Sequence, residues 1–551
     1  MQKLFSFSLF YFCVLSTQAQ VPTGPSIAWQ RCYGGGGTDS FVDAVITSDG
    51  GFAAIAEFGS TDGDMADQDS LLYPATLMKF DSDMNLLWWR NYGGTTYGCG
   101  FTDLLESDEG GFIVGGLSGD TDGDFGENYG SLDFILLETD VDGDILWSKH
   151  YGSPGLEDFG NFIQTQDGGF LITGTSTSSG NDIPFHYSGG MGTTDAIIFK
   201  TDSIGNLQWL KNLGGSEYDG FLGDPVEISR GQYILSIGSN SEDHDLAGCG
   251  ISGPKRWIFQ MDSMGNITKE NFISPFEHLQ NADGETTLNQ FKVTPVSQGN
   301  AYSVLFPAEP GHMDEEGAIA FFDTALLELV DMKQWGGSGY DGFRKSCRDE
   351  NGNYYFLGFS NSTDYDLPGN YNDGEAFDYW LLATDSNFVT LWSRNFGGSD
   401  PCGDLGCSGF VGDIIYKDNI IYVFTKNVVP EILPDFDIEC GHASVYGSFG
   451  YTDAWLVAFD LSTAIQQNPI ESQTFSIYPN PAYDEIIIEP SIKENKQIQI
   501  IITDINGKQI YSADHFQNEQ MKINTEKFQA GVYLITIKSD TSIYEQKIII
   551  Q

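Results

Sequence analysis

Basic residues are scarce in this sequence. Its 551 residues include 26 Lys and Arg against 78 Asp and Glu, a formal net charge of −52 at pH 7. Such a charge repels phosphate backbones and anionic lipid headgroups. Nucleic acid and membrane surfaces are therefore disfavoured as partners. Cation binding and simple solubility both remain as explanations of the acidity.

Long apolar runs and catalytic signatures are also missing. Met1–Ala19 combines one Lys, an apolar run and small residues before Gln20, which predicts a secretory signal peptide cut after Ala19. No later segment is apolar enough to span a bilayer, so no transmembrane anchor is expected. There is no Gly-x-Ser-x-Gly elbow, no His-Glu-x-x-His pair and no phosphate-binding Gly loop ahead of a helix. We single out no catalytic residue and no cofactor-binding residue.

Little of the sequence reads as helix, whereas residues of short strands and tight turns are abundant, with 66 Gly, 39 Phe and 26 Tyr. The segment Leu132–Gly152 reads as two strands joined by an Asp/Gly turn. Its pattern recurs at Thr76–Gly94, Ala196–Gly215 and Tyr379–Gly398. A recurrence of roughly 60 residues fits a four-stranded propeller blade with one long loop.

The repeat count predicts a closed ring. Sets of three strand-like pieces begin near Phe41, Phe101, Phe159, Phe221, Phe291, Phe343 and Phe410. The chain opens with a lone fourth strand, Ile27–Tyr33, and the repeats end on an incomplete set at Trp455–Asp460. Closure of the ring pairs these two segments and leaves no open edge. We predict an all-β fold with a seven-bladed β-propeller over 20–462, closed by the N-terminal strand, and a linker at 463–475.

The sequence changes character after the linker: Lys returns and β-branched runs predict a small Ig-like β-sandwich over 476–551. This segment contains SIYPNP, TDINGK, AGVYLITI and a final Lys-Ile-Ile-Ile. It closely resembles the type A C-terminal sorting domain of type IX secretion cargo from Bacteroidota-type bacteria. The resemblance assigns the sorting motif to Tyr478, Pro479, Asn480, Pro481, Asp504, Gly507, Gly531, Tyr533 and Lys547. It implies the type IX machinery as a partner, and a secreted or outer-membrane surface location in a Gram-negative bacterium.

The repeats themselves resemble the Gly/Asp-rich β-propeller repeats that often precede such tails. Their turn pattern also resembles that of quinone-cofactor propellers, where it is structural. We therefore interpret Trp88, Trp147, Trp209 and Trp392 as residues that pack blades together.

The long loops carry Asp pairs with one residue between the two carboxylates. In an extended loop both side chains point the same way, and Gly-rich loops expose carbonyl oxygens, so calcium is a candidate ligand. Turn capping by Asp side chains explains the pairs equally simply, and no loop has the full calcium-loop spacing. The candidate metal ligands are Asp62, Asp64, Asp122, Asp124, Asp243, Asp245, Asp364 and Asp366.

Two further sets of Asp recur once per repeat: Asp133, Asp195, Asp378 and Asp453 precede one strand, and Asp39, Asp158, Asp219 and Asp341 follow the Gly-Gly link. Fixed register predicts structural anchors between blades. Seven Cys remain after the signal segment, and in an oxidising compartment most should pair. Cys440 with Cys402 or Cys407 is the first expected disulfide.

Two functions fit the sequence. The first is an extracellular binding or adhesion protein whose loop face, with aromatics such as Phe185 and Tyr187, contacts a glycan or a surface protein. The second is a propeller hydrolase or lyase that acts on polysaccharide.

Overall fold

A computed structural model describes residues 24–65, 73–126, 128–187, 193–221, 224–273, 301–303, 306–307, 315–323, 327–339, 341–364, 367, 377–398, 412–428, 437–441, 452–463, 475–478, 485–490, 497–504, 508–516, 520–525, 528, 531–538 and 543–550. The chain forms two compact units, Met1–Ala464 and Ile465–Gln551. The elements in the described ranges are β-strands and short 3-10 turns, which confirms the all-β prediction. No helix in these ranges is long and apolar enough to cross a membrane.

The described strands of the first unit form seven antiparallel sheets, numbered here along the chain. Sheet 1 has β2 (Asp39–Ile46), β3 (Phe52–Phe58), β4 (Ala75–Phe80) and β5 (Leu86–Tyr92). Sheet 2 has β6 (Cys99–Glu106), β7 (Phe112–Ser118), β8 (Asp133–Thr139) and β9 (Ile145–Tyr151). Sheet 3 has β10 (Glu157–Gln164), β11 (Phe170–Ser176), β12 (Asp195–Thr201) and β13 (Leu207–Leu213).

The later sheets follow the same order with local variations. Sheet 4 has β14 (Asp219–Phe221), β15 (Val226–Ser229), β16 (Gln232–Ser239), β17 (Lys255–Asp262) and β18 (Ile267–Ile273). Sheet 5 has β19 (Ala301–Ser303), β20 (Phe306–Pro307), β21 (Glu315–Asp323) and β22 (Glu328–Trp335). Sheet 6 has β23 (Asp341–Arg348), β24 (Tyr354–Ser360), β25 (Asp378–Thr384) and β26 (Thr390–Phe396).

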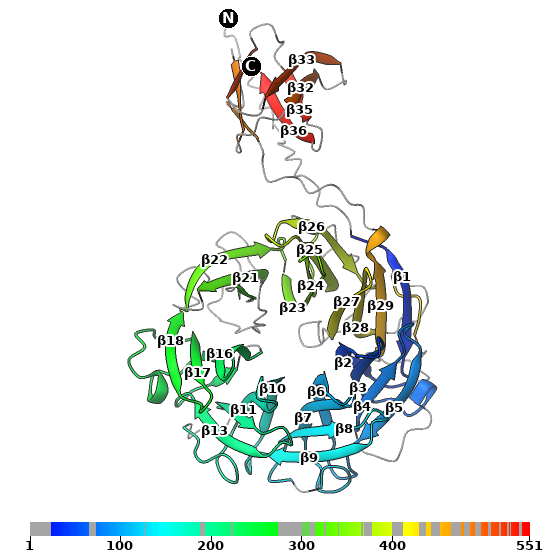
Figure 1. Ribbon diagram of the computed structural model, residues 1–551, viewed down its shortest axis with the longest axis vertical. Helices are drawn as coiled ribbons and strands as arrows, with labels where there is room; N and C mark the ends of the chain where they lie inside the picture. The colour runs from blue at the N-terminus through cyan, green and yellow to red at the C-terminus, as the bar shows by residue number, and fades with distance from the viewer. Residues whose placement is uncertain are drawn as a thin grey trace, which may run out of the picture. The chain divides into compact units, whose positions relative to one another are not determined.

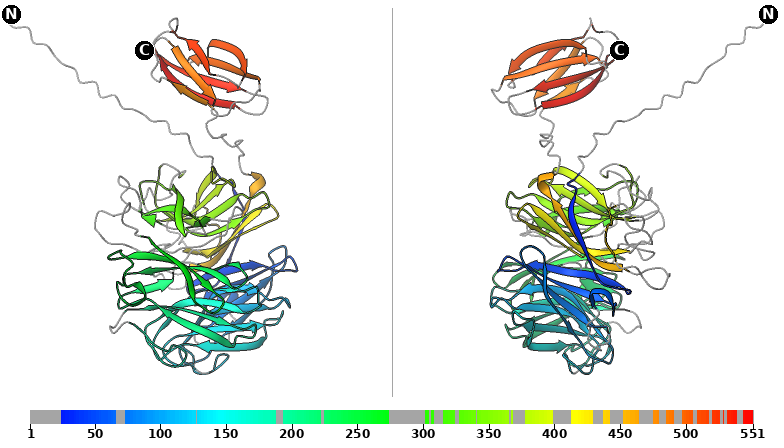
Figure 2. Two further views of the ribbon diagram at one scale, coloured as in Figure 1. Left: turned by 60° about the vertical axis from the view of Figure 1, so that its left-hand side comes forward. Right: turned by 90° about the vertical axis from the view of Figure 1, so that its right-hand side faces the viewer.

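Sheet 7 joins the two ends of the first unit. It consists of β27 (Asp413–Lys417), β28 (Ile420–Val428), β29 (Thr452–Asp460) and the N-terminal strand β1 (Ile27–Tyr33). β1 pairs antiparallel with β29, with Trp29 opposite Ala458 and Cys32 opposite Trp455 (Figure 2). The predicted pairing of the two end segments is therefore present.

The seven sheets surround a common centre (Figure 1). The strands β2, β6, β10 and β23 lie innermost, and β1, β5, β9, β13, β18, β22 and β26 lie on the outside. Apolar side chains of neighbouring sheets pack face to face, and two of the four predicted indoles make ring contacts with the next sheet. Trp88 of β5 packs on Phe112 of sheet 2, and Trp147 of β9 packs on Phe170 of sheet 3.

The disulfide of sheet 7 corrects a prediction. Cys32 of β1 is bonded to Cys440, 408 residues away, rather than Cys440 to Cys402 or Cys407. The prediction considered only Cys residues of the last repeat. Ring closure brings β1 into that same sheet and supplies the partner. Cys402 and Cys407 lie outside the described residues. Among the described residues, Cys99 and Cys249 are free thiols.

The second unit has its own core. β30 (Phe475–Tyr478), β31 (Glu485–Pro490) and β34 (Met521–Asn524) form one sheet. β32 (Gln497–Asp504), β33 (Gln509–Phe516), β35 (Gly531–Lys538) and β36 (Ile543–Ile550) form the other. Alternating isoleucines of both sheets, such as Ile488 and Ile500, are buried against one another.

Candidate functional site

The predicted Asp pairs are bonded to the links between sheets. The first member of each pair accepts a hydrogen bond from a backbone N–H of the link that enters its own sheet. The donor–acceptor distances are 2.6 Å for Gly36 to Asp62 and 2.8 Å for Thr95 to Asp122, Ser216 to Asp243 and Ser338 to Asp364. These contacts are what turn capping predicts.

The second members behave similarly. Asp124 accepts from the Gly93 N–H at 3.0 Å, and Asp245 accepts from the Gly214 N–H at 3.1 Å. Asp64 donates its own backbone N–H to Gly34 O at 2.8 Å, and Asp366 lies outside the described residues. No three His, Cys, Asp or Glu side chains in the described ranges are grouped closely enough to hold a metal ion. Calcium binding stays a prediction.

A second acidic arrangement lies where one sheet passes into the next. The glycine that follows the outer strand has no room for a Cβ, because acidic side chains pack against its Cα. A Cβ on Gly34 would lie 2.2 Å from Asp39 and 2.8 Å from Asp453, and one on Gly152 would lie 2.6 Å from Asp133 and 2.9 Å from Glu157. At each of these junctions, an acid near the start of the third strand of one sheet lies beside an acid at the start of the next sheet.

At the junction between sheets 2 and 3, the acid that begins the inner strand is Glu157, not Asp158. Glu157 pairs with Ser176 across sheet 3 as Asp39 pairs with Phe58 and Asp219 with Ser239, so these three share one register. We predicted the aspartate from the sequence and missed the glutamate beside it. A search for either acid at the first position of the inner strand would have found Glu157.

The junction between sheets 1 and 2 is different. Pro74 and Cys99 stand at the positions of the two acids, beside Gly93. The carboxylate instead comes from the loop: Asp120 accepts hydrogen bonds from the N–H groups of Thr96, Tyr97 and Gly98 at 2.9–3.2 Å. At this junction the link is therefore bonded by a loop carboxylate, Asp120, rather than by acids at the strand starts.

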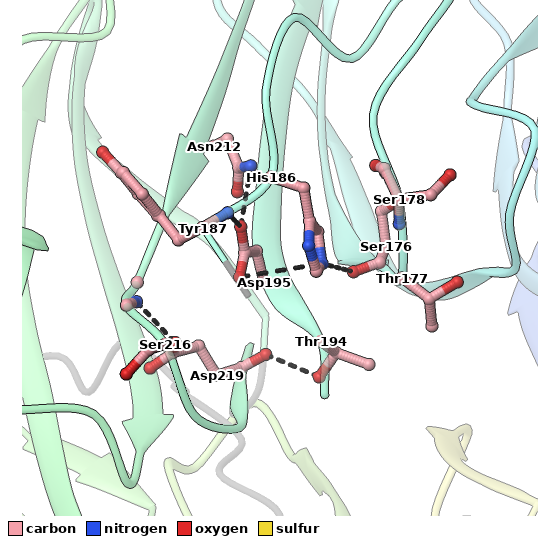
Figure 3. A network of polar contacts seen from close by, with 12 residues as sticks. Ser176, Thr177, Ser178, His186, Tyr187, Thr194, Asp195, Asn212, Ser216 and Asp219 are labelled. Atoms are coloured by element: carbon pink, nitrogen blue, oxygen red, sulfur yellow. Dashed lines mark hydrogen bonds and ion pairs between the residues drawn. The ribbon is translucent and has the colours of Figure 1, made fainter. Parts of the chain in front are cut away.

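The junction between sheets 3 and 4 includes a histidine (Figure 3). Asp195 accepts from Tyr187 N at 2.7 Å and Asn212 Nδ2 at 2.9 Å, and His186 Nε2 lies 3.8 Å from its other oxygen. Burial raises the pKa of Asp195, and burial raises the pKa of Asp219 to about 6. His186 also contacts Ser176 O at 3.0 Å.

The innermost strands carry a polar ring that was not predicted from the sequence. Asp43, Asp103, Asn161 and Lys345 each follow a β-bulge two residues after an aligned phenylalanine. Each contacts another sheet. Asp43 accepts from Leu104 N at 3.1 Å, Asp103 accepts from Phe162 N at 3.1 Å, and Asn161 donates to Asp224. The fixed offset from the phenylalanines was a visible signal.

Lys345 is the cation of this ring. Its ammonium lies 2.9 Å from Asp43 and 3.8 Å from Asp413. Its pKa stays well above the ordinary value, because the attraction of Asp43 and Asp413 outweighs the opposing effect of burial. Burial, followed by the charge of Asp43, raises the pKa of Asp103 well above its usual range.

Aromatic side chains gather on loops of sheets 3 and 4. The ring of Tyr187 stacks on His244 at 4.4 Å, and Phe185 meets Tyr187 edge-on at 4.9 Å. Phe185 is 42% exposed, and His244 has a φ of 52°, an uncommon conformation for a residue other than glycine. We call Phe185, Tyr187 and His244 the aromatic platform.

The predicted sorting-motif residues lie on the strands of the second unit where they are described. Tyr478 ends β30, Asp504 ends β32, Gly531 and Tyr533 lie on β35, and Lys547 lies on β36. Tyr533 is buried beside Phe528. Pro479, Asn480, Pro481 and Gly507 lie outside the described residues.

Comparison with known proteins assigns the tail. The family described as secretion system C-terminal sorting domain matches residues 476–551, which supports a type IX sorting domain and export to the cell surface or secretion. No curated protein matches the chain.

Solved structures resemble the chain at low similarity. Quinohemoprotein alcohol dehydrogenase from Comamonas testosteroni is 10% identical with a TM-score of 0.37, covering 84% of this chain and 79% of its own. Hydrazine synthase from Kuenenia stuttgartiensis is 9% identical with a TM-score of 0.33, covering 69% and 81%. A puromycin hydrolase mutant is 10% identical with a TM-score of 0.41, covering 74% and 53%.

Proposed function

We propose that this chain is a type IX cargo of a Bacteroidota-type bacterium: a seven-bladed β-propeller with an Ig-like sorting domain that acts outside the cell as a binding or adhesion protein. The observation that carries the proposal is the sorting-domain match at residues 476–551. A propeller over 20–462, preceded by a signal peptide at 1–19, is the cargo. The closing pairing of β1 with β29 supports a complete ring.

The export part is tested by deleting residues 476–551 in a host with the type IX machinery. The truncated protein should accumulate in the periplasm, and the full chain should reach the surface or the medium. Normal surface display of the truncated protein refutes the assignment.

The binding part is supported by the aromatic platform. Aromatic faces bind apolar faces of sugars and cationic groups, and half-exposed rings held by stacking lose little entropy on binding. The test is a glycan array with the native chain and with Phe185→Ala and His244→Ala. Tyr97→Ala, which removes a 55% exposed ring from another link, is the matched control. Binding lost only in the platform variants supports a glycan ligand.

A polysaccharide hydrolase or lyase is the second candidate. The observation in its favour is the pair of inner-ring carboxyl groups: Asp43 lies 2.9 Å from the Lys345 ammonium, and burial raises the pKa of its neighbour Asp103, and two carboxyl groups in different environments are what acid and base catalysis requires. Product release that Asp103→Asn abolishes would establish it; binding with intact ligand favours the first function.

Calcium in the loops is part of the same proposal and has its own test. Calorimetric titration of calcium into the native chain should release or absorb heat and raise the melting temperature if Asp62, Asp122, Asp243 or Asp364 ligate it. Absence of both effects ends the calcium hypothesis.

A further inference from the structure

The junction between sheets 2 and 3 holds two carboxyl groups in contact. Asp133 begins β8 and Glu157 begins β10, and their exposed fractions are 0% and 1%. Both pack against the Cα of Gly152, which lies in the link between the two sheets. No ion pair in the described part of the chain includes either acid. Two ionised carboxylates in this position would repel each other without compensation.

One oxygen of each carboxyl group accepts hydrogen bonds from neighbouring groups. Asp133 Oδ2 accepts from Tyr129 N at 2.5 Å. Glu157 Oε1 accepts from the hydroxyls of Ser153 at 2.6 Å and Ser176 at 2.7 Å. The remaining oxygens, Asp133 Oδ1 and Glu157 Oε2, are buried and receive no hydrogen bond from a described donor. Two acceptors that face each other need one hydrogen between them.

The described groups around the pair add negative charge rather than positive. Asp182, from the loop after β11, acts on Asp133 with a further negative charge and accepts from Gly152 N at 3.2 Å. From β9, His150 packs on Phe125, and the phenol of Tyr151 donates to Gly205 O. The link itself contributes Ser153, which is neutral.

We propose that Asp133 and Glu157 share one proton, and that this carboxyl–carboxylate contact is a pH-dependent clasp between sheets 2 and 3. The clasp is closed while one proton bridges Asp133 Oδ1 and Glu157 Oε2. Loss of that proton leaves two buried anions and opens the junction.

The titration of the two groups agrees with this assignment. Burial, with the charge of Glu157 and Asp182, raises the pKa of Asp133 to about 7, and burial raises the pKa of Glu157. Both pKa values exceed those of the unfolded chain, which are about 4. The folded junction therefore binds more protons, and its stability is fully present below about pH 4 and is lost as pH rises from about 4 to about 7.

The junction at Gly93 differs and serves as an internal control. It has Pro74 and Cys99 in place of the two acids. This junction therefore has no pair of carboxyl groups that could share a proton.

The test is hydrogen exchange of the native full chain between pH 5 and 9, corrected for intrinsic exchange rates. Local opening of segments 129–139 and 152–164 should increase about tenfold per pH unit between pH 5 and about 7 and level off above that. Glu157→Gln keeps the acceptor for both serines, and its amide N–H replaces the proton. This variant should remove the pH dependence, while segment 99–106 changes alike in both proteins.

In Asp133→Asn, the amide N–H of the new side chain replaces the shared proton from the Asp133 side of the contact. This variant is the test if Glu157→Gln does not fold. Loss of the pH dependence in either variant supports the clasp. If local opening has the same pH dependence in the native chain and in a folded amide variant, the clasp is overturned. A pH-independent native junction overturns it as well.

Discussion

Sheets 2 and 7 have the same four-strand order but are held together differently. In sheet 2 every neighbouring strand is also the next in sequence, and the chain itself connects each pair. In sheet 7 the outer pair, β29 and β1, comes from opposite ends of the first unit, and no turn can join it. The disulfide between Cys32 and Cys440 takes the place of that turn. We call the pairing of β1 with β29 the seam. At the seam, one covalent bond thus takes the place of the short turn that joins the outer strands of the other sheets.

Gln30 adds a polar connection at the same seam. Its amide oxygen accepts from Trp455 Nε1 at 2.9 Å, and its amide nitrogen donates to Asp437 O at 2.8 Å. The side chain therefore connects β1, β29 and the loop that bears Cys440. In sheet 2 the corresponding contact is made by Asp140, whose side chain accepts from the N–H groups of Asp142 and Asp144 within one turn.

The largest expected effect is that of removing the seam's central ring. Trp455 is fully buried against Tyr379 and Phe396, so Trp455→Ala should lower the free energy of unfolding by about 3–5 kcal/mol. Phe134→Ala in sheet 2 should cost a similar amount. Chemical denaturation measures both, and hydrogen exchange should show β1 released only by the Trp455 variant. Release of β1 in both variants would erase the distinction between the sheets.

Loss of the disulfide should affect sheet 7 alone. The double variant Cys32→Ser with Cys440→Ser should be less stable by about 2–5 kcal/mol, because the bond closes a very long loop of the unfolded chain. Reductant should reproduce this loss in the native protein and leave the double variant unchanged. Equal stability of the two proteins without reductant would mean that strand pairing suffices.

Removal of Gln30 tests the polar part of the seam. Gln30→Ala should cost about 2 kcal/mol, because the indole N–H of Trp455 is left without an acceptor. Gln30→Glu retains an acceptor and is the matched control. Thermal unfolding distinguishes them, and an alanine variant as stable as the native chain would contradict the role given to Gln30.

The smallest effect is expected in a turn of sheet 2. Gly143 has a φ of 82° in the turn between β8 and β9, so Gly143→Ala should cost about 1 kcal/mol. Gly126 has a φ of 74° and nothing within 4 Å of the position that a Cβ would take, so Gly126→Ala gives a strain-only reference. Thermal unfolding measures both variants. A loss larger than that of Gln30→Ala would reverse the proposed ranking.

The sequence predicted the parts that depend on periodicity. Strand order, the Asp/Gly turns and the pairing of Ile27–Tyr33 with the Trp455 segment follow from repeat spacing, because each repeat has one register. The partner of Cys440 was missed because it depends on the seam rather than on proximity in sequence. Glu157 was missed because two adjacent acids compete for one position. The inner ring was missed because a β-bulge decides which side chain turns inward.

The loop face could be predicted only in outline. The carboxylates of Asp62, Asp122 and Asp243 read equally well as calcium ligands and as turn caps. Their contacts with backbone N–H groups could not be inferred without the fold. The stacking of Tyr187 on His244 joins loops of two sheets and has no signature in either loop alone.

Circular closure is the claim on which the loop face and the junctions depend. Peptide mapping of the exported protein without reduction tests it directly. We expect one cross-linked species that joins the peptide of Cys32 to the peptide of Cys440. A bond from Cys440 to Cys402 or Cys407, with Cys32 free, would contradict the seam between β1 and β29.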